Sequence, residues 1–105
     1  MSAPASNKAE VVERLQNASR RLSSLGVKGI GLFGSFVTGR QTPASDVDLL
    51  VEFEPERHSF DNFMDLSFFL EELLGRRVEV VTPESLGPHI GPHILREVER
   101  VRLAA

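Results

Sequence analysis

The stretch that decides the fold is residues 31–53, GLFGSFVTGRQTPASDVDLLVEF. It contains a Gly-Ser pair, Gly34 and Ser35, then ten residues, then two aspartates, Asp46 and Asp48, separated by one valine. In a strand, residues i and i+2 share a face, so both carboxylates should project together, roughly 6.6 Å apart along the backbone at about 3.3 Å per residue. Two neighbouring carboxylates repel each other unless a cation lies between them.

The flanking residues predict two strands joined by a loop. Residues 46–53 alternate in polarity, which is typical of a strand with one buried face. The apolar set is Val47, Leu49, Val51 and Phe53, and the open face carries Asp46, Asp48, Leu50 and Glu52. Upstream, the short apolar run 28–33 predicts a strand that ends at Gly34, and a loop punctuated by Gly39, Pro43 and Ser45 returns the chain to the aspartates.

The Gly-Ser turn and the paired acids suggest phosphate chemistry. A glycine lets the backbone approach a ligand closely, and the Ser35 hydroxyl and the following N–H groups can bond phosphate oxygens. Side chains that lean inward from Asp46 and Asp48 can hold divalent ions about 3.5 to 4 Å apart, the separation used in two-metal phosphoryl or nucleotidyl transfer. The alternative is a hairpin corner with solvated acids.

This pattern resembles the minimal nucleotidyltransferase family of the DNA polymerase beta superfamily. The resemblance rests on the Gly-Ser turn, the Asp-x-Asp pair and the later segment 76–86, RRVEVVTPESL, and it covers about residues 8–103. It implies an α+β fold with a small mixed β-sheet backed by helices on one face. It also implies that Gly34 and Ser35 hold the nucleotide phosphates and that Asp46 and Asp48 bind Mg²⁺, with two ions expected.

The sequence departs from the family pattern at two positions. The family usually has a third acid, commonly Asp, in a later strand, and here that position is Glu79. Glu79 can serve as a metal ligand and base, or it can be an outward-facing surface acid. The family also commonly has Arg just before the Gly that follows the Gly-Ser turn, whereas this chain has Thr38 there and Arg40 just after Gly39. Arg40 is the expected phosphate contact, with a changed side-chain direction.

The resemblance implies transfer of AMP from MgATP to a hydroxyl. Members of the family pair with HEPN-domain toxins and act as their antitoxins, so the expected acceptor is a side chain of such a toxin, for example a tyrosine hydroxyl. Two other functions stay open. The chain could be a degenerate enzyme that neutralises its partner by binding alone, or it could modify a small molecule, as aminoglycoside nucleotidyltransferases do.

A competing motif overlaps the first. Residues 29–34 match G-x-G-x-x-G, and Glu52 and Glu54 lie near the distance at which a dinucleotide-binding fold places its ribose acid. That motif requires a strand before the first glycine and a helix that opens at the third. Here a helical pattern precedes it and the first two glycines fall inside the predicted strand, so the dinucleotide interpretation is rejected.

Composition limits the remaining possibilities. With 105 residues, 41% hydrophobic and 26% charged, the chain is expected to form one globular domain over residues 7–105, after a flexible tail at 1–6. No cysteine is present, so disulfides and thiolate metal sites are excluded. The net charge of −3 argues against non-specific nucleic-acid binding. No apolar run approaches 18 residues and no signal peptide is apparent, so a cytoplasmic location is expected.

Apolar spacing predicts three helices in the rest of the chain. The first covers residues 7–25 and stops at Gly26; the second begins at Ser59 and closes at Gly75; the third covers 93–103 after an irregular, proline-rich connection. A strand is expected at 77–81. Phe68 or Phe69 of the second helix is a candidate contact for a partner protein. His89 and His93 are four apart, but Gly91 and Pro92 lie between them, so solvent or partner contact is expected rather than metal binding.

Overall fold

A four-stranded sheet forms the centre of the molecule, which is seen here in a computed structural model that describes residues 3–103. The strand order is β3-β2-β1-β4. The strands are β1 (Val27–Phe33), β2 (Val47–Phe53), β3 (Val78–Val81) and β4 (Glu99–Val101). β1 is antiparallel to β2 and β4, whereas β2 and β3 are parallel. The sheet is therefore mixed, which confirms the predicted fold class.

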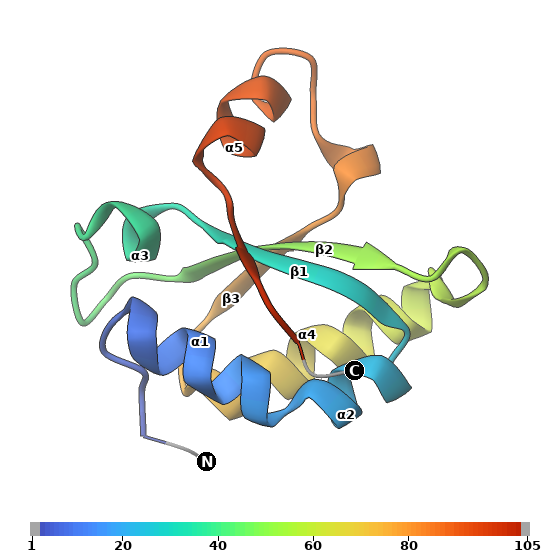
Figure 1. The fold of residues 1–105 in the computed structure, drawn as a ribbon, viewed down its shortest axis with the longest axis horizontal. Helices are drawn as coiled ribbons and strands as arrows, with labels where there is room; N and C mark the ends of the chain where they lie inside the picture. The colour runs from blue at the N-terminus through green and yellow to red at the C-terminus, as the bar shows by residue number, and fades with distance from the viewer. Residues whose placement is uncertain (1–2, 104–105) are drawn as a thin grey trace.

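Helices α1, α2 and α4 cover one face of this sheet, and α5 stands on the opposite side (Figure 1). The hydrophobic core lies between the sheet and the three covering helices. It includes fully buried side chains from β1, β2 and α4, among them Leu32, Val47, Leu49, Val51, Leu66 and Leu70. Within residues 3–103, no helix is both long and apolar enough to cross a lipid bilayer.

The first predicted helix is two helices in the structure, α1 (Lys8–Asn17) and α2 (Ser19–Ser24). The prediction of one continuous helix over 7–25 is therefore wrong at Ala18, where φ is −97° and ψ is 15°. The hydroxyl of Ser19 donates to the carbonyl of Gln16 at 2.6 Å. Such a local side-chain bond competes with the helical hydrogen-bond ladder, and this competition accounts for the break.

The segment between β1 and β2 is not only a loop, because it begins with a single helical turn, α3 (Ser35–Thr38). Gly34 is the residue before α3, and its carbonyl accepts hydrogen bonds from the amides of Val37 and Thr38. The strand that carries the acids starts one residue later than predicted, so Asp46 immediately precedes β2. The predicted alternation holds for Val47, Leu49 and Val51, but Leu50, on the opposite face, is also buried.

The second predicted helix is confirmed as α4 (Phe60–Leu74), which follows the short 3-10 helix η1 (Pro55–Arg57). The hydroxyl of Ser59 accepts a hydrogen bond from the amide of Asn62, as an N-cap residue should. Gly75 ends the helix in the left-handed conformation, at φ 65°.

The C-terminal segment differs from the predicted helix over 93–103. It forms a 3-10 turn, η2 (Pro83–Ser85), then α5 (Gly91–Glu97), and finally β4. Val98 leaves the helical region, at φ −62° and ψ 136°. The next residues pair with β1 in the register Ile30↔Val101 and Leu32↔Glu99. These residues therefore pair with the edge of β1 instead of continuing the helix.

The N-terminal segment lies against the domain from Ala3 onward, because the carbonyl of Ala3 accepts a hydrogen bond from the guanidinium of Arg14 at 2.6 Å. Ala5 is fully buried, its amide donates to the carbonyl of Leu74 at 2.9 Å, and its carbonyl accepts from the guanidinium of Arg76 at 2.5 Å. Within the tail predicted at residues 1–6, positions 1 and 2 lie outside the described residues. The part that is described is thus attached to the domain at Ala3 and Ala5.

Candidate active site

The sheet brings Asp48 and Glu79 side by side. They are direct neighbours in the parallel pairing of β2 and β3, and on its other side Asp48 pairs with Phe33, the last residue of β1. Asp46 lies two residues before Asp48 and adds its charge to the same group. The three acids predicted from the sequence therefore gather where β1 ends and β2 begins.

This cluster of acids leaves Asp48 in an unfavourable environment for its charge. The pKa of Asp48 is raised from 3.8 to about 6, chiefly by burial and then by the charge of Glu79, a hydrogen bond with Glu79, and the charges of Asp46 and Glu97. Burial and like charges both favour the protonated carboxyl. The site consequently carries excess negative charge that a bound cation would offset.

Only glycine fits at position 34, beside Asp48. Its φ of 80° lies in the region that favours glycine, and a Cβ atom at this position would be 2.1 Å from Oδ2 of Asp48. The turn therefore places a backbone amide directly against the acid cluster. That amide donates to Oε1 of Glu97 at 2.8 Å.

Ser35 and Arg40 lie at opposite ends of the short segment that contains α3. Ser35 is the first residue of α3, and its carbonyl accepts a hydrogen bond from the amide of Arg40 at 3.0 Å. The first N–H groups of a helix have no partner inside it, so the amides at this end face outward from α3. The side chain of Arg40 is exposed. Its contact with phosphate remains a prediction, as does that of Ser35.

Sequence reasoning missed two residues around the site. One is Glu97 on α5, which reaches Gly34 from 63 positions away in the chain. The other is Arg76, whose guanidinium donates to the carbonyls of Thr42, Pro43 and Ser45 at 3.2, 3.1 and 2.9 Å. No local pattern marks either residue, because their partners are distant in sequence.

Arg76 braces the loop that leads into Asp46. Besides its three loop carbonyls, its guanidinium lies 5.1 Å from the ring centroid of Phe36 in α3. One side chain thus ties α3 to the far end of the same loop. Because the loop connects the Gly-Ser turn to the aspartates, Arg76 helps to fix their relative positions.

The donor set suits a hard divalent cation, although a complete ligand cluster is not formed in advance. Asp46, Asp48 and Glu79 offer carboxylate oxygens, which are the ligands that Mg²⁺ prefers. Over residues 3–103, no three His, Asp or Glu side chains are close enough together to hold a metal ion as they stand. The side chains would have to turn toward a shared ion.

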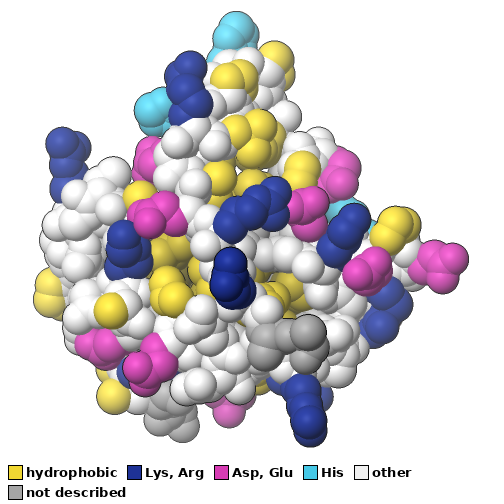
Figure 2. All heavy atoms as spheres, in the orientation of Figure 1, with side chains coloured by type: hydrophobic (Ala, Val, Ile, Leu, Met, Phe, Trp, Pro, Cys, Tyr) yellow, Lys and Arg dark blue, Asp and Glu magenta, His cyan; other side chains and the backbone are white. Residues whose placement is uncertain are grey.

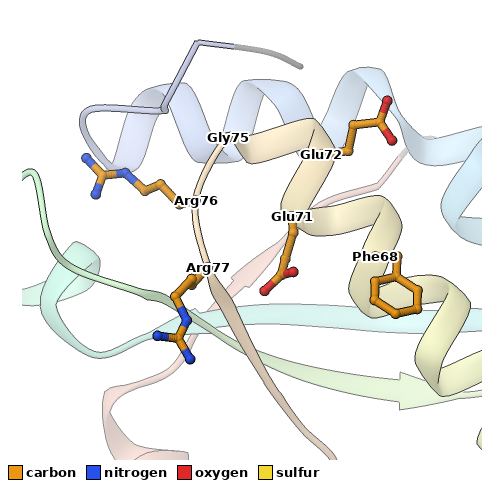
Figure 3. Close-up of a pocket in the computed structure, with 6 residues that line it drawn as sticks. All are labelled: Phe68, Glu71, Glu72, Gly75, Arg76 and Arg77. Carbon is orange, nitrogen blue, oxygen red and sulfur yellow. The ribbon is translucent and has the colours of Figure 1, made fainter.

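A separate hollow lies between the end of α4 and the start of β3 (Figure 3). Its volume is about 680 Å³, and it is lined by Phe68, Glu71, Glu72, Gly75, Arg76 and Arg77. None of the predicted site residues lines it. Phe68 is 62% exposed there, so its predicted contact with a partner protein remains open.

The fold and the cluster of acids beside a Gly-Ser turn define a nucleotidyltransferase. The model of the nucleotidyltransferase domain family matches residues 12–102, and the chain belongs to this family. It is 43% identical over 91 residues to the protein adenylyltransferase MntA of Thermococcus cleftensis, across 85% of this chain and 91% of that protein. Membership of this family and the similarity to a protein adenylyltransferase identify the chain as a transferase.

Solved structures with the same fold include a minimal nucleotidyltransferase and toxin–antitoxin complexes. A minimal nucleotidyltransferase has a TM-score of 0.79 and 30% identity, covering 92% of this chain and 98% of that one. A toxin–antitoxin complex with AMP-PNP has a TM-score of 0.65 and 19% identity, covering 94% and 75%. A tri-AMPylated Shewanella oneidensis HEPN toxin with its MNT antitoxin has a TM-score of 0.56 and 17% identity, covering 85% and 72%. At 19% and 17% identity, the two complexes show a similarity of fold alone to this chain.

Proposed function

We propose that this chain is a Mg²⁺-dependent protein adenylyltransferase that moves AMP from ATP to a hydroxyl group of a HEPN-domain toxin and so acts as its antitoxin. The observation that carries the proposal is the pairing of Asp48 with Glu79 beside the amide of Gly34. This arrangement sets a group that accepts protons next to a turn that can hold phosphate. The 43% identical relative is a protein adenylyltransferase, which supports AMP as the group transferred.

Each site residue has a distinct part in this proposal. The amide of Gly34, the hydroxyl of Ser35 and the guanidinium of Arg40 bind the triphosphate oxygens and orient the α-phosphate. Asp46, Asp48 and Glu79 would hold Mg²⁺, which neutralises charge on the triphosphate when it is bound.

Glu79 is the proposed base. It stands next to Asp48 at the edge of the acid cluster, where it can accept the proton of the acceptor hydroxyl. The oxygen of that hydroxyl then bonds to the α-phosphorus, and the bond from this phosphorus to the pyrophosphate breaks.

The deciding experiment is an intact mass measurement of a HEPN toxin after incubation with this protein and MgATP. We expect the toxin to gain one or more AMP groups. A toxin that forms a complex but keeps its mass would instead indicate an antitoxin that acts by binding alone. Modification of an aminoglycoside but not of the toxin would indicate a small-molecule enzyme.

A pair of double variants makes this measurement specific to the site. Asp46→Asn with Asp48→Asn should abolish the added mass, because the groups proposed to hold the metal are lost. Asp61→Asn with Asp65→Asn removes the same charge from exposed positions on α4, which lies on the other face of the sheet, and should transfer AMP at the parent rate. Transfer at the parent rate by the first variant would refute the assignment of the site.

A further inference from the structure

The carboxylate of Glu97 occupies the place at the Gly-Ser turn where an anionic ligand would bind. The Gly34 amide donates to Oε1 of Glu97 at 2.8 Å, and this amide belongs to the turn proposed to hold phosphate. Charge-assisted bonds between backbone N–H groups and anions are strong ones. A carboxylate on this amide therefore takes the position that a phosphate oxygen would need.

The contact between Glu97 and the Gly34 amide places the Glu97 carboxylate near other negative charges, which is unfavourable. Asp48 senses the charge of Glu97 in addition to those of Glu79 and Asp46. The groups that hold the Glu97 carboxylate are the Gly34 amide and, at 3.6 Å from its Oε2, Nε2 of His93 one turn earlier on α5. A triphosphate that reached the turn would compete with this carboxylate for the amide and would also be repelled by its negative charge.

The element that carries Glu97 has few buried residues. α5 has seven residues, and Gly91 is its one buried residue. Leu95 within α5 and Ile90 just before it are 56% and 62% exposed. Figure 1 shows α5 standing away from the sheet, on the side opposite α1, α2 and α4. Few buried apolar contacts allow a segment to move at low cost, and the Glu97 side chain can also rotate by itself.

We propose that Glu97 is a built-in competitor of the nucleotide: its carboxylate holds the Gly34 amide in the free protein and is displaced when the triphosphate binds. This inference rests on the nucleotide site proposed above. When the binding-competent form is only part of the population, the apparent affinity falls in proportion. Removal of the competing carboxylate should therefore tighten nucleotide binding.

The first test is the affinity for α,β-methylene-ATP with Mg²⁺, measured by calorimetry, because its bridging carbon prevents transfer at the α-phosphate. Glu97→Ala should lower the Kd about tenfold, which corresponds to about 1.4 kcal/mol. Glu97→Gln keeps an acceptor and loses the charge, so its Kd should fall less. Glu99→Gln makes the same change of charge two residues away, where the side chain pairs with Lys8, and should bind as the parent does.

The second test separates competition from a general charge effect. In the free protein, Glu97→Ala should shift the amide resonance of Gly34 in a ¹H–¹⁵N spectrum. With saturating α,β-methylene-ATP, the Gly34 resonances of the parent and of Glu97→Ala should coincide, since Glu97 has left the amide in both. Bound-state resonances that differ as much as the free ones, or Glu97 variants that bind no tighter than the parent, would overturn the inference. A parent that does not bind the analogue would refute the proposed nucleotide site itself.

Discussion

The two faces of β2 do opposite things to the molecule. On one face, Val47, Leu49 and Val51 are fully buried in the core together with side chains of α1, α2 and α4. On the other face, Asp48 lies among other acids and its pKa is raised to about 6. The buried apolar residues of β2 therefore stabilise the fold, whereas Asp48 on the other face carries its charge in an unfavourable environment.

Stability and chemistry can therefore be altered separately within the seven residues of β2. The buried face contributes apolar area, which is worth about 25 cal/mol per Å² removed from water. The acid face costs free energy of folding until a cation offsets its charge. Figure 2 shows Lys and Arg side chains interspersed with Asp and Glu over the face it draws, so that face is not uniformly acidic.

The largest effect is expected from a substitution on the buried face of β2. Leu49→Ala removes a side chain with no exposed surface, so we expect a loss of about 2–5 kcal/mol in the free energy of unfolding. The corresponding fall in Tm is roughly 10–30 °C for a domain of this size, measured by circular dichroism. Leu95→Ala makes the same truncation at a position that is 56% exposed and should change stability by about 0.5 kcal/mol or less. Equal losses for the two variants would contradict the assigned core.

The next effect, on the acid face, should appear in rate rather than stability. Glu79→Gln is expected to lower the rate of AMP transfer about a hundredfold with nucleotide affinity little changed, because proton removal is lost and the phosphate contacts remain. Glu84→Gln, at an exposed position on η2, is the matched control. Glu79→Asp then tests side-chain length: a gain in rate means that Glu is suboptimal, and a large loss means that the site is adapted to it. If both Glu79 variants match the parent, Glu79 is a surface acid.

A smaller effect is expected at the Gly-Ser turn. Ser35→Ala removes the hydroxyl and keeps the backbone amides, so we expect about a tenfold loss of kcat/KM, near the low end of the 1.5–3 kcal/mol typical of a hydrogen bond to a charged group. Ser24→Ala is a suitable control, because that hydroxyl bonds to the Arg21 carbonyl at the end of α2. An unchanged kcat/KM for Ser35→Ala would remove the hydroxyl from the phosphate site.

The same comparison explains how much could be predicted from the sequence. Alternation in β2 and the boundaries of α4 at Ser59 and Gly75 are local properties, and the sequence displays them directly. The C-terminal strand is not local: residues 99–101 become β4 because β1 offers them an open edge.

The site divides in the same way. The Gly-Ser turn and the paired aspartates are close in sequence, so their meeting could be predicted. The placement of Glu79 next to Asp48 depended on a family resemblance, and the parallel pairing of β2 and β3 provides its physical reason. The contacts of Glu97 and Arg76 join residues separated by 31 to 71 positions, and no spacing rule reports such contacts.

The smallest effect tests whether the acid face costs stability. Asp48 has a pKa of about 6 in the folded protein, above its ordinary value of 3.8, so the folded state binds this proton more tightly than the unfolded state does. The favourable contribution of the protonated group is therefore present below pH 4 and is lost as the pH rises to about 6. Without Mg²⁺, Asp48→Asn should be more stable than the parent above pH 6, by about 1 kcal/mol once solvent screening of a partly exposed group is allowed for.

Denaturant titrations of the two proteins at pH 4 and at pH 7.5 measure this difference, which should vanish at the lower pH. Asp61→Asn provides a control of opposite sign, because Asp61 lies in the first turn of α4, where a negative charge favours the helix. Added Mg²⁺ should stabilise the parent and leave Asp48→Asn nearly unchanged, since a bound cation removes the repulsion that the substitution also removes. A parent that is more stable than Asp48→Asn at pH 7.5 without metal would show that the acid face contributes to folding as the buried face does, and the contrast between the two faces would then fail.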